Sequence, residues 1–351
     1  MASRGRPYGL TNLGNTCYIN SLLQCLNAVG LVNVLQPLAG APAQVRNPRA
    51  KANRDLYVAL HKTLRVMASP GQRPVLRPQT FVETLQRCAH ALGRPDFAGW
   101  GQNDVAELYT LIGQCVHEST KKEARVQITV SDRHRMTPID QRCSDRLTEF
   151  LKQEYSVAAK SLAGIEAGVV TQPNGEYLSA LAETFYVLAV PVPPTASTVE
   201  DCVIAFGAES QMTGENQYRM ANPDSPEEEG DLVDAVERRI VWLAPQFLVV
   251  ETRLYRVSNR RNFIQKGYER LEASNTLSLP AWSAGRETKV KYGLCAVAYH
   301  RGGSREGGHY TAVIRDRNGQ KWNCNDTAVA PLSRGAQWPM GGYCFFYRKI
   351  L

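Results

Sequence analysis

The chain has 351 residues, of which 43% are hydrophobic and 21% are charged, so it can bury a substantial core in one large domain or two modest ones. Its formal charge of +8 includes no dense basic block, which argues against nucleic-acid binding, and no apolar run reaches the roughly 18 residues that a membrane span needs. Nine scattered cysteines without a C-x-x-C pair are typical of reduced thiols, so we expect an intracellular protein of the cytoplasm or nucleus.

The first predicted element is a helix that begins at Cys17. Apolar residues follow at the spacing of one helix face: Ile19, Leu22, Leu23 and Leu26. The small polar residues before Cys17 are typical of a turn with an N-cap, so the thiol lies where the helix dipole favours a thiolate. Isolated cysteines are more often buried core residues than nucleophiles, so a reactive cysteine stays one of two interpretations. Asn12 could offer an amide donor to an oxyanion beside the sulfur.

Residues 9–24, which read GLTNLGNTCYINSLLQ, resemble the cysteine box of the ubiquitin-specific proteases. The resemblance implies an α+β, papain-like cysteine protease fold in a single catalytic domain over residues 1–351. A helical thumb would cover about residues 1–120, β fingers would be inserted at about 165–245, and a β-rich palm would form the remainder. It also implies that Cys17 is the nucleophile and that Asn12 stabilises the oxyanion.

Two packing helices are predicted next, because apolar residues recur on one face of residues 56–67 and again of 81–92. We assign no chemistry to them. The first ends near Ser69-Pro70-Gly71 and the second at Gly93, residues that commonly end helices.

A further helix is predicted from Val105, and two acids, Asp104 and Glu107, lie three residues apart on one side of its first turn. From spacing alone, helix capping is the favoured interpretation. The segment also resembles the family's Q-x-D-x-x-E box, in which the acids line the channel for ubiquitin's arginine-bearing tail and the glutamine lies beside the catalytic centre. The resemblance makes Gln102, Asp104 and Glu107 candidates for substrate binding.

The stretch from about 120 to 185 carries weak patterns, after which strands and a helix from Thr198 resemble the family's fingers. Many members hold zinc there with two C-x-x-C turns. The corresponding positions in this chain offer no thiolate: Thr171, Asn174, Met220 and Pro223. We therefore expect no metal site and no cofactor. The apolar run Phe247 to Val250 predicts a central strand.

The C-terminal part predicts two strands, at 292–300 and 308–315, joined by a glycine-rich loop. Two histidines, His300 and His309, compete for a catalytic role. The string resembles the family's histidine box, in which the histidine of G-H-Y is the general base. The resemblance therefore selects His309, leaves His300 as a structural neighbour, and makes Gly308 and Tyr310 candidates for contact with substrate.

An acyl-transfer site of this kind needs a group that orients the imidazole, which an Asn or Asp on a neighbouring strand can supply. The family's third catalytic residue maps to Asn325, and the adjacent Asp326 is a candidate auxiliary. Cys324 stands where the family has phenylalanine, a difference that concerns packing.

The sequence thus predicts a thiol-dependent deubiquitinase that cleaves the (iso)peptide bond after ubiquitin's C-terminal glycine by a Cys-His-Asn/Asp mechanism. Its partners would be ubiquitin or a ubiquitinated protein and a regulatory or targeting protein, with no nucleic acid and no membrane. Two alternatives stay open. The missing zinc turns and an altered L-K-R-F element at 251–256 would suit a catalytically silent ubiquitin-binding scaffold, and another ubiquitin-like modifier could be the substrate.

Overall fold

The computed structural model describes residues 6–38, 47–69, 75–122, 136–151, 155–220, 230–252, 255–258, 263–266, 271–283, 285–302 and 307–350. Pro223 and the middle of the altered L-K-R-F element, at 253–254, lie outside the described residues. Thr171 ends a strand, Asn174 lies in the turn after it and Met220 follows another strand, so the absence of a zinc site stays a prediction.

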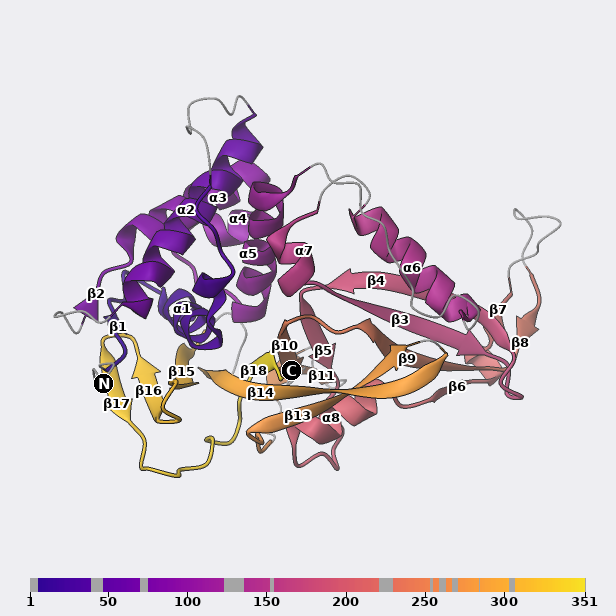
Figure 1. The fold of residues 1–351 in the computed structure, drawn as a ribbon. Helices are drawn as coiled ribbons and strands as arrows, with labels where there is room; N and C mark the ends of the chain where they lie inside the picture. The colour runs from indigo at the N-terminus through magenta and orange to yellow at the C-terminus, as the bar shows by residue number, and fades with distance from the viewer. Residues whose placement is uncertain are drawn as a thin grey trace.

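Helices form one side of the molecule (Figure 1). They are α1 (Cys17–Val29), α2 (Pro48–Ala68), α3 (Gln79–Leu92), α4 (Pro95–Ala98) and α5 (Val105–Thr120), with a 3-10 turn, η1 (Leu31–Asn33), after α1. The Asn47 side chain accepts hydrogen bonds from the N–H groups of Arg49 and Ala50 and so caps α2, whose first residue is Pro48. Helices α2, α3 and α5 confirm the helices predicted from periodicity.

An eight-stranded sheet lies against these helices, in the order β17-β16-β15-β14-β18-β10-β5, with β13 also paired to β14. Its strands are β5 (Val187–Val190), β10 (Phe247–Thr252), β13 (Thr276–Ser283), β14 (Arg286–Arg301), β15 (His309–Arg315), β16 (Lys321–Asn325), β17 (Ala328–Pro331) and β18 (Cys344–Lys349). Every pair is antiparallel except β10 with β5. Strand β10 lies between two neighbours, which confirms the predicted central strand.

A second sheet extends away from the helices, in the order β4-β3-β9-β6 (Figure 1). Its strands are β3 (Gly164–Thr171), β4 (Tyr177–Phe185), β6 (Ser210–Met212) and β9 (Ala235–Leu243). Helix α6 (Pro138–Leu151) covers it and buries Cys143 against Ile165 and Val169. Helix α6 lies in the stretch where the sequence patterns are weak.

The remaining elements are short. They are α7 (Val157–Ser161), α8 (Val199–Phe206), η4 (Gly214–Asn216) and the strand pairs β1 (Gly9–Leu10) with β2 (Val75–Leu76), β7 (Tyr218–Arg219) with β8 (Leu232–Val233), and β11 (Tyr255–Ser258) with β12 (Phe263–Lys266). Within the described ranges, no helix is both long and apolar enough to cross a membrane.

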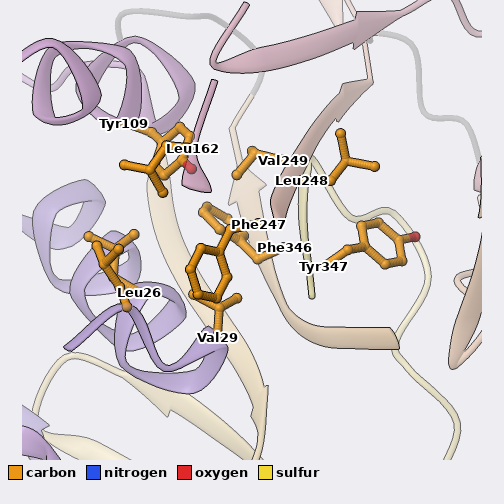
Figure 2. Close-up of a pocket in the computed structure, with 10 residues that line it drawn as sticks. Leu26, Val29, Tyr109, Leu162, Phe247, Leu248, Val249, Phe346 and Tyr347 are labelled. Carbon is orange, nitrogen blue, oxygen red and sulfur yellow. The ribbon is translucent and has the colours of Figure 1, made fainter. Parts of the chain in front are cut away.

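The main core lies where α1 and α5 meet the eight-stranded sheet (Figure 2). Leu26 and Val29 of α1 face Phe247 and Phe346, and the ring of Tyr109 on α5 meets Phe346 edge to face at a centroid distance of 5.9 Å. Because α1 also packs against β14 and β15, its first residue, Cys17, is fixed against the strand that begins at His309.

Candidate active site

Cys17 opens α1 and is 1% exposed. The backbone N–H of Tyr310, on β15, donates to its sulfur at 3.4 Å. Burial raises the pKa of the Cys17 thiol, the Tyr310 N–H lowers it in part, and the charge of Asp326 raises it again. Burial is the largest of these effects, and its direction opposes the thiolate that the helix terminus alone would favour.

His309, the first residue of β15, faces Asn325, the last residue of β16 on the neighbouring strand. Its Nε2 lies 2.6 Å from the Asn325 side-chain oxygen. An amide oxygen only accepts hydrogen bonds, so Nε2 carries the proton and Nδ1 keeps a lone pair. Among the described contacts, Cys17 and His309 share no hydrogen bond, so the imidazole and thiol have to approach each other for proton transfer.

Asp326 joins the two ends of the chain. Its carboxylate accepts hydrogen bonds from the side-chain amides of Asn12, at 2.9 Å, and of Asn20, at 2.8 Å. Its backbone carbonyl accepts from the N–H of Leu10 at 2.8 Å. The residue has a φ of 50°, in the left-handed region that aspartate tolerates better than most residues. The turn before Cys17 is thus held by the strand end that carries the imidazole's partner.

Asn12 uses its side-chain oxygen within the turn, where it accepts from the N–H groups of Gly14 at 3.0 Å and Thr16 at 3.2 Å. One amide hydrogen goes to Asp326, which leaves the other for an oxyanion. The position next to the start of α1 suits the predicted donor role.

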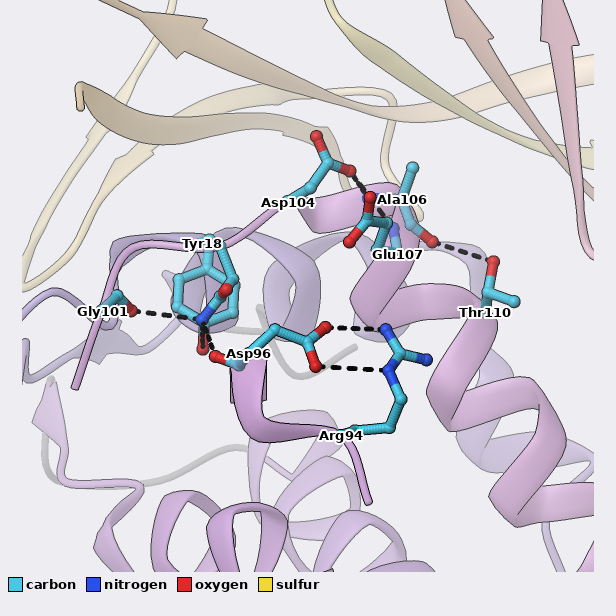
Figure 3. Close-up of polar contacts among 9 residues, drawn as sticks. Tyr18, Arg94, Asp96, Gly101, Asp104, Ala106, Glu107 and Thr110 are labelled. Carbon is cyan, nitrogen blue, oxygen red and sulfur yellow. Dashed lines mark hydrogen bonds and ion pairs between the residues drawn. The ribbon is translucent and has the colours of Figure 1, made fainter. Parts of the chain in front are cut away.

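Asp104 is the N-cap of α5 (Figure 3). One carboxylate oxygen accepts from the N–H groups of Ala106 at 2.7 Å and Glu107 at 3.1 Å, and the other accepts from the Tyr343 hydroxyl at 2.5 Å. Asp104 is 5% exposed. The capping interpretation therefore describes its contacts, and its buried carboxylate does not suit direct pairing with a substrate arginine. Glu107, one turn along and half-buried, is the better candidate for that contact.

Gln102 connects the helical side to the loop before the histidine, because its side-chain amide donates to the carbonyl of Gly308. Gly308 has a φ of +155°, and a Cβ there would lie 2.4 Å from Nε2 of His300. Only glycine fits this position. His300 itself is buried, and its ring packs on Tyr310 at a centroid distance of 4.5 Å, as a structural neighbour would.

A family model described as ubiquitin carboxyl-terminal hydrolase matches residues 8–347. The chain belongs to this family. Ubiquitin carboxyl-terminal hydrolase 2 of Bos taurus is 23% identical over 345 residues, which cover 97% of this chain and 54% of that protein. Ubiquitin carboxyl-terminal hydrolase 21 of Bos taurus is 25% identical over 365 residues, which cover 97% and 61%. The chain thus spans little more than half the length of these relatives.

Solved structures agree on the fold. A chain of the SAGA Ubp8/Sgf11/Sus1/Sgf73 DUB module bound to ubiquitin aldehyde superimposes with a TM-score of 0.71 at 18% identity, covering 100% of this chain and 71% of that one. The same module bound to monoubiquitin gives a TM-score of 0.68 at 19% identity, with the same coverage. These comparisons confirm the predicted α+β fold of the ubiquitin carboxyl-terminal hydrolases.

In this ubiquitin carboxyl-terminal hydrolase chain, direct contacts join most predicted site residues, and the backbone N–H of Glu107 donates to the Asp104 cap. Two residues without a predicted role also contribute. Asn20, 2% exposed on α1, holds Asp326, and Tyr343 touches both Asp104 and Glu251. A buried asparagine on an apolar helix face is the signal that could have identified the first, since buried polar groups need partners.

Proposed function

We propose that this chain is the catalytic part of a thiol-dependent deubiquitinase that hydrolyses the bond after ubiquitin's C-terminal glycine. Family membership supports the reaction class. The observation that carries the proposal is the meeting of α1 and β15, where the N–H of Tyr310 touches the Cys17 sulfur at 3.4 Å while the adjacent His309 is held by Asn325 at 2.6 Å.

The mechanism follows from the resting thiol. His309 accepts the thiol proton at Nδ1 as the sulfur of Cys17 attacks the carbonyl carbon. The free amide hydrogen of Asn12 and backbone N–H groups at the start of α1 stabilise the oxyanion. When the C–N bond breaks, the imidazolium returns the proton to the leaving amine, and a thioester to Cys17 remains. His309 then removes a proton from water as the water oxygen attacks the thioester carbon. The C–S bond breaks to release ubiquitin with a C-terminal carboxyl group, and the imidazolium returns its proton to the Cys17 sulfur.

Substrate binding would involve the segment from Gln102 to Glu107. The half-buried Glu107 pairs with arginines of the ubiquitin tail, a contact worth about 1–3 kcal/mol for a charge-assisted hydrogen bond. Gly308 lies on the opposite wall, where the absence of a side chain suits a tail that ends in glycines, and the buried Tyr310 supports this wall from behind. Asp104 serves the same channel indirectly, by fixing α5 and Tyr343.

The proposal also covers the parts of the catalytic domain, the location in the cell and a partner protein. The helices to residue 120 serve as the thumb, the eight-stranded sheet as the palm and the four-stranded sheet as the fingers of a single catalytic domain. All nine cysteines are buried thiols and not disulfides, which supports an intracellular, cytoplasmic or nuclear location. The related module contains Sgf11, Sus1 and Sgf73 beside Ubp8, which supports a regulatory or targeting partner for this chain too.

A ubiquitin probe with a C-terminal electrophile tests the function. We expect a covalent adduct with the wild-type chain and none with Cys17→Ala. Ubiquitin binding without any wild-type adduct would instead support the catalytically silent scaffold. Parallel probes built on other ubiquitin-like modifiers would reveal a different substrate by faster labelling.

A further inference from the structure

Trp100 is an exposed tryptophan beside the nucleophile's turn. It is 53% exposed, although tryptophan is among the side chains that gain most from burial. A Cβ on Gly14 would lie 3.9 Å from the Trp100 ring, so the indole borders the turn between Asn12 and Cys17. Gly14, Asn15 and Gly101 are exposed as well, and together with Trp100 they form an open surface at the entrance of α1.

Hydrogen bonds hold the backbone on both sides of Trp100. Its carbonyl accepts from the side-chain amide of Asn15 at 3.0 Å, and the preceding carbonyl, of Gly99, accepts from Gln86 at 3.0 Å. The Asn103 side chain donates to the carbonyl of Gly101 at 3.2 Å and to that of Asp96 at 2.7 Å (Figure 3). An aromatic side chain on so constrained a segment loses little freedom when it binds a partner.

The order of contacts along residues 100–107 indicates which part of a substrate Trp100 meets. Glu107, in the first turn of α5, lies where the ubiquitin tail is proposed to bind. Five residues earlier in the chain, Gln102 contacts Gly308, which is next to His309. Trp100 is at the opposite end, against the turn that carries the oxyanion donor. In the proposed function the tail contacts Glu107 and the scissile carbonyl meets Cys17, so the surface of Trp100, at the far end of this order, is available to the leaving group.

We propose that Trp100 binds the leaving-group side of the substrate, namely the lysine side chain to which ubiquitin is attached and the residues that flank it. The methylene stem of that lysine packs on the indole face, as lysine stems do on apolar surfaces. This inference rests on the proposed function and adds a determinant of which conjugates are cleaved well.

The test compares two ubiquitin substrates on the same variants. One is ubiquitin joined by an isopeptide bond to a lysine-containing peptide, and the other is a ubiquitin probe that ends in a C-terminal alkyne and has no leaving group. We expect Trp100→Ala to lower kcat/KM for the peptide conjugate roughly tenfold, with no comparable loss of the probe's labelling rate. Trp100→Phe should recover most of the loss because it keeps an aromatic face.

Leu181→Ala is the matched control, because Leu181 is 69% exposed on β4 of the four-stranded sheet. It should leave both rates unchanged. Equal losses on both substrates for Trp100→Ala, or no loss on either, would overturn the proposal. A wild-type chain that reacts with neither substrate would instead overturn the proposed function, so the two failures are distinguishable. A melting curve of each variant checks that it is folded.

Discussion

Replacing Asp104 with alanine separates a structural role of this carboxylate from a role in direct substrate contact. The change removes the acceptor for two N–H groups at the start of α5 and for the Tyr343 hydroxyl. Loss of an N-cap costs up to about 2 kcal/mol, whereas the Tyr343 hydroxyl can still donate its proton to Glu251. With an unfolding entropy of about 2.1 cal/mol/K per residue over 351 residues, about 2 kcal/mol lowers Tm by about 3 °C.

Asp104→Asn should be much milder, for a reason specific to Tyr343. Its hydroxyl lies 2.5 Å from the Asp104 carboxylate and 2.7 Å from that of Glu251, but it has one proton to donate. An asparagine keeps the oxygen that caps α5, and its amide can donate to Tyr343, which then donates to Glu251. We expect Asp104→Asn to keep Tm within about 1–2 °C of the wild type.

Thermal unfolding and steady-state hydrolysis of a ubiquitin substrate measure the two effects. Glu107→Gln is the matched control, since it removes a charge from the same helical turn without removing the cap acceptor. It should raise KM and change Tm less than Asp104→Ala. A wild-type Tm for Asp104→Ala combined with a raised KM would refute the capping argument and restore Asp104 as a direct contact.

Three further outcomes are expected at the catalytic centre. Asn325→Ala should lower kcat about 100-fold or more with little change in KM, because the imidazole loses the acceptor at Nε2; unchanged kcat would refute the orienting role. The rate at which iodoacetamide alkylates Cys17, followed by peptide mass spectrometry, should rise with pH and give an apparent pKa above the ordinary 9.0. An apparent pKa below 9.0 would show that burial is not the dominant effect. Gly308→Ala should abolish most activity, since the new methyl meets His300; Gly93→Ala, with positive φ but open space, is the control and should retain full kcat.

Most helices could be predicted because each buries one regular face. The 3- and 4-residue spacings in α2, α3 and α5 depend only on local geometry. The hairpin of β14 and β15 is predicted from its glycine-rich loop and is confirmed, but the distant strand neighbours could not be predicted in the same way. Strand β10 pairs with β18, about 100 residues later, and β14 also pairs with β18. Such pairings depend on which surfaces meet in three dimensions, which a periodicity of two does not encode.

Asp104 and Glu107 show what could be predicted from the sequence and what required the structure. Spacing alone favours capping for Asp104 and Glu107, and the family resemblance favours substrate contact. The structure separates them, because the buried Asp104 accepts a hydrogen bond from Tyr343 while Glu107 stays half-buried. Tyr343 comes from the far end of the chain, so its contact could not be read from the segment itself.

Asp326 adds to the effect of burial on the Cys17 thiol and also anchors the neighbouring turn. The carboxylate accepts hydrogen bonds from Asn12 and Asn20 and so fixes the proposed oxyanion donor beside Cys17. The same negative charge, added to burial, raises the pKa of the Cys17 thiol. A raised pKa of the Cys17 thiol is the reason that the proposed mechanism relies on His309, which Asn325 holds at 2.6 Å, to remove the proton during attack.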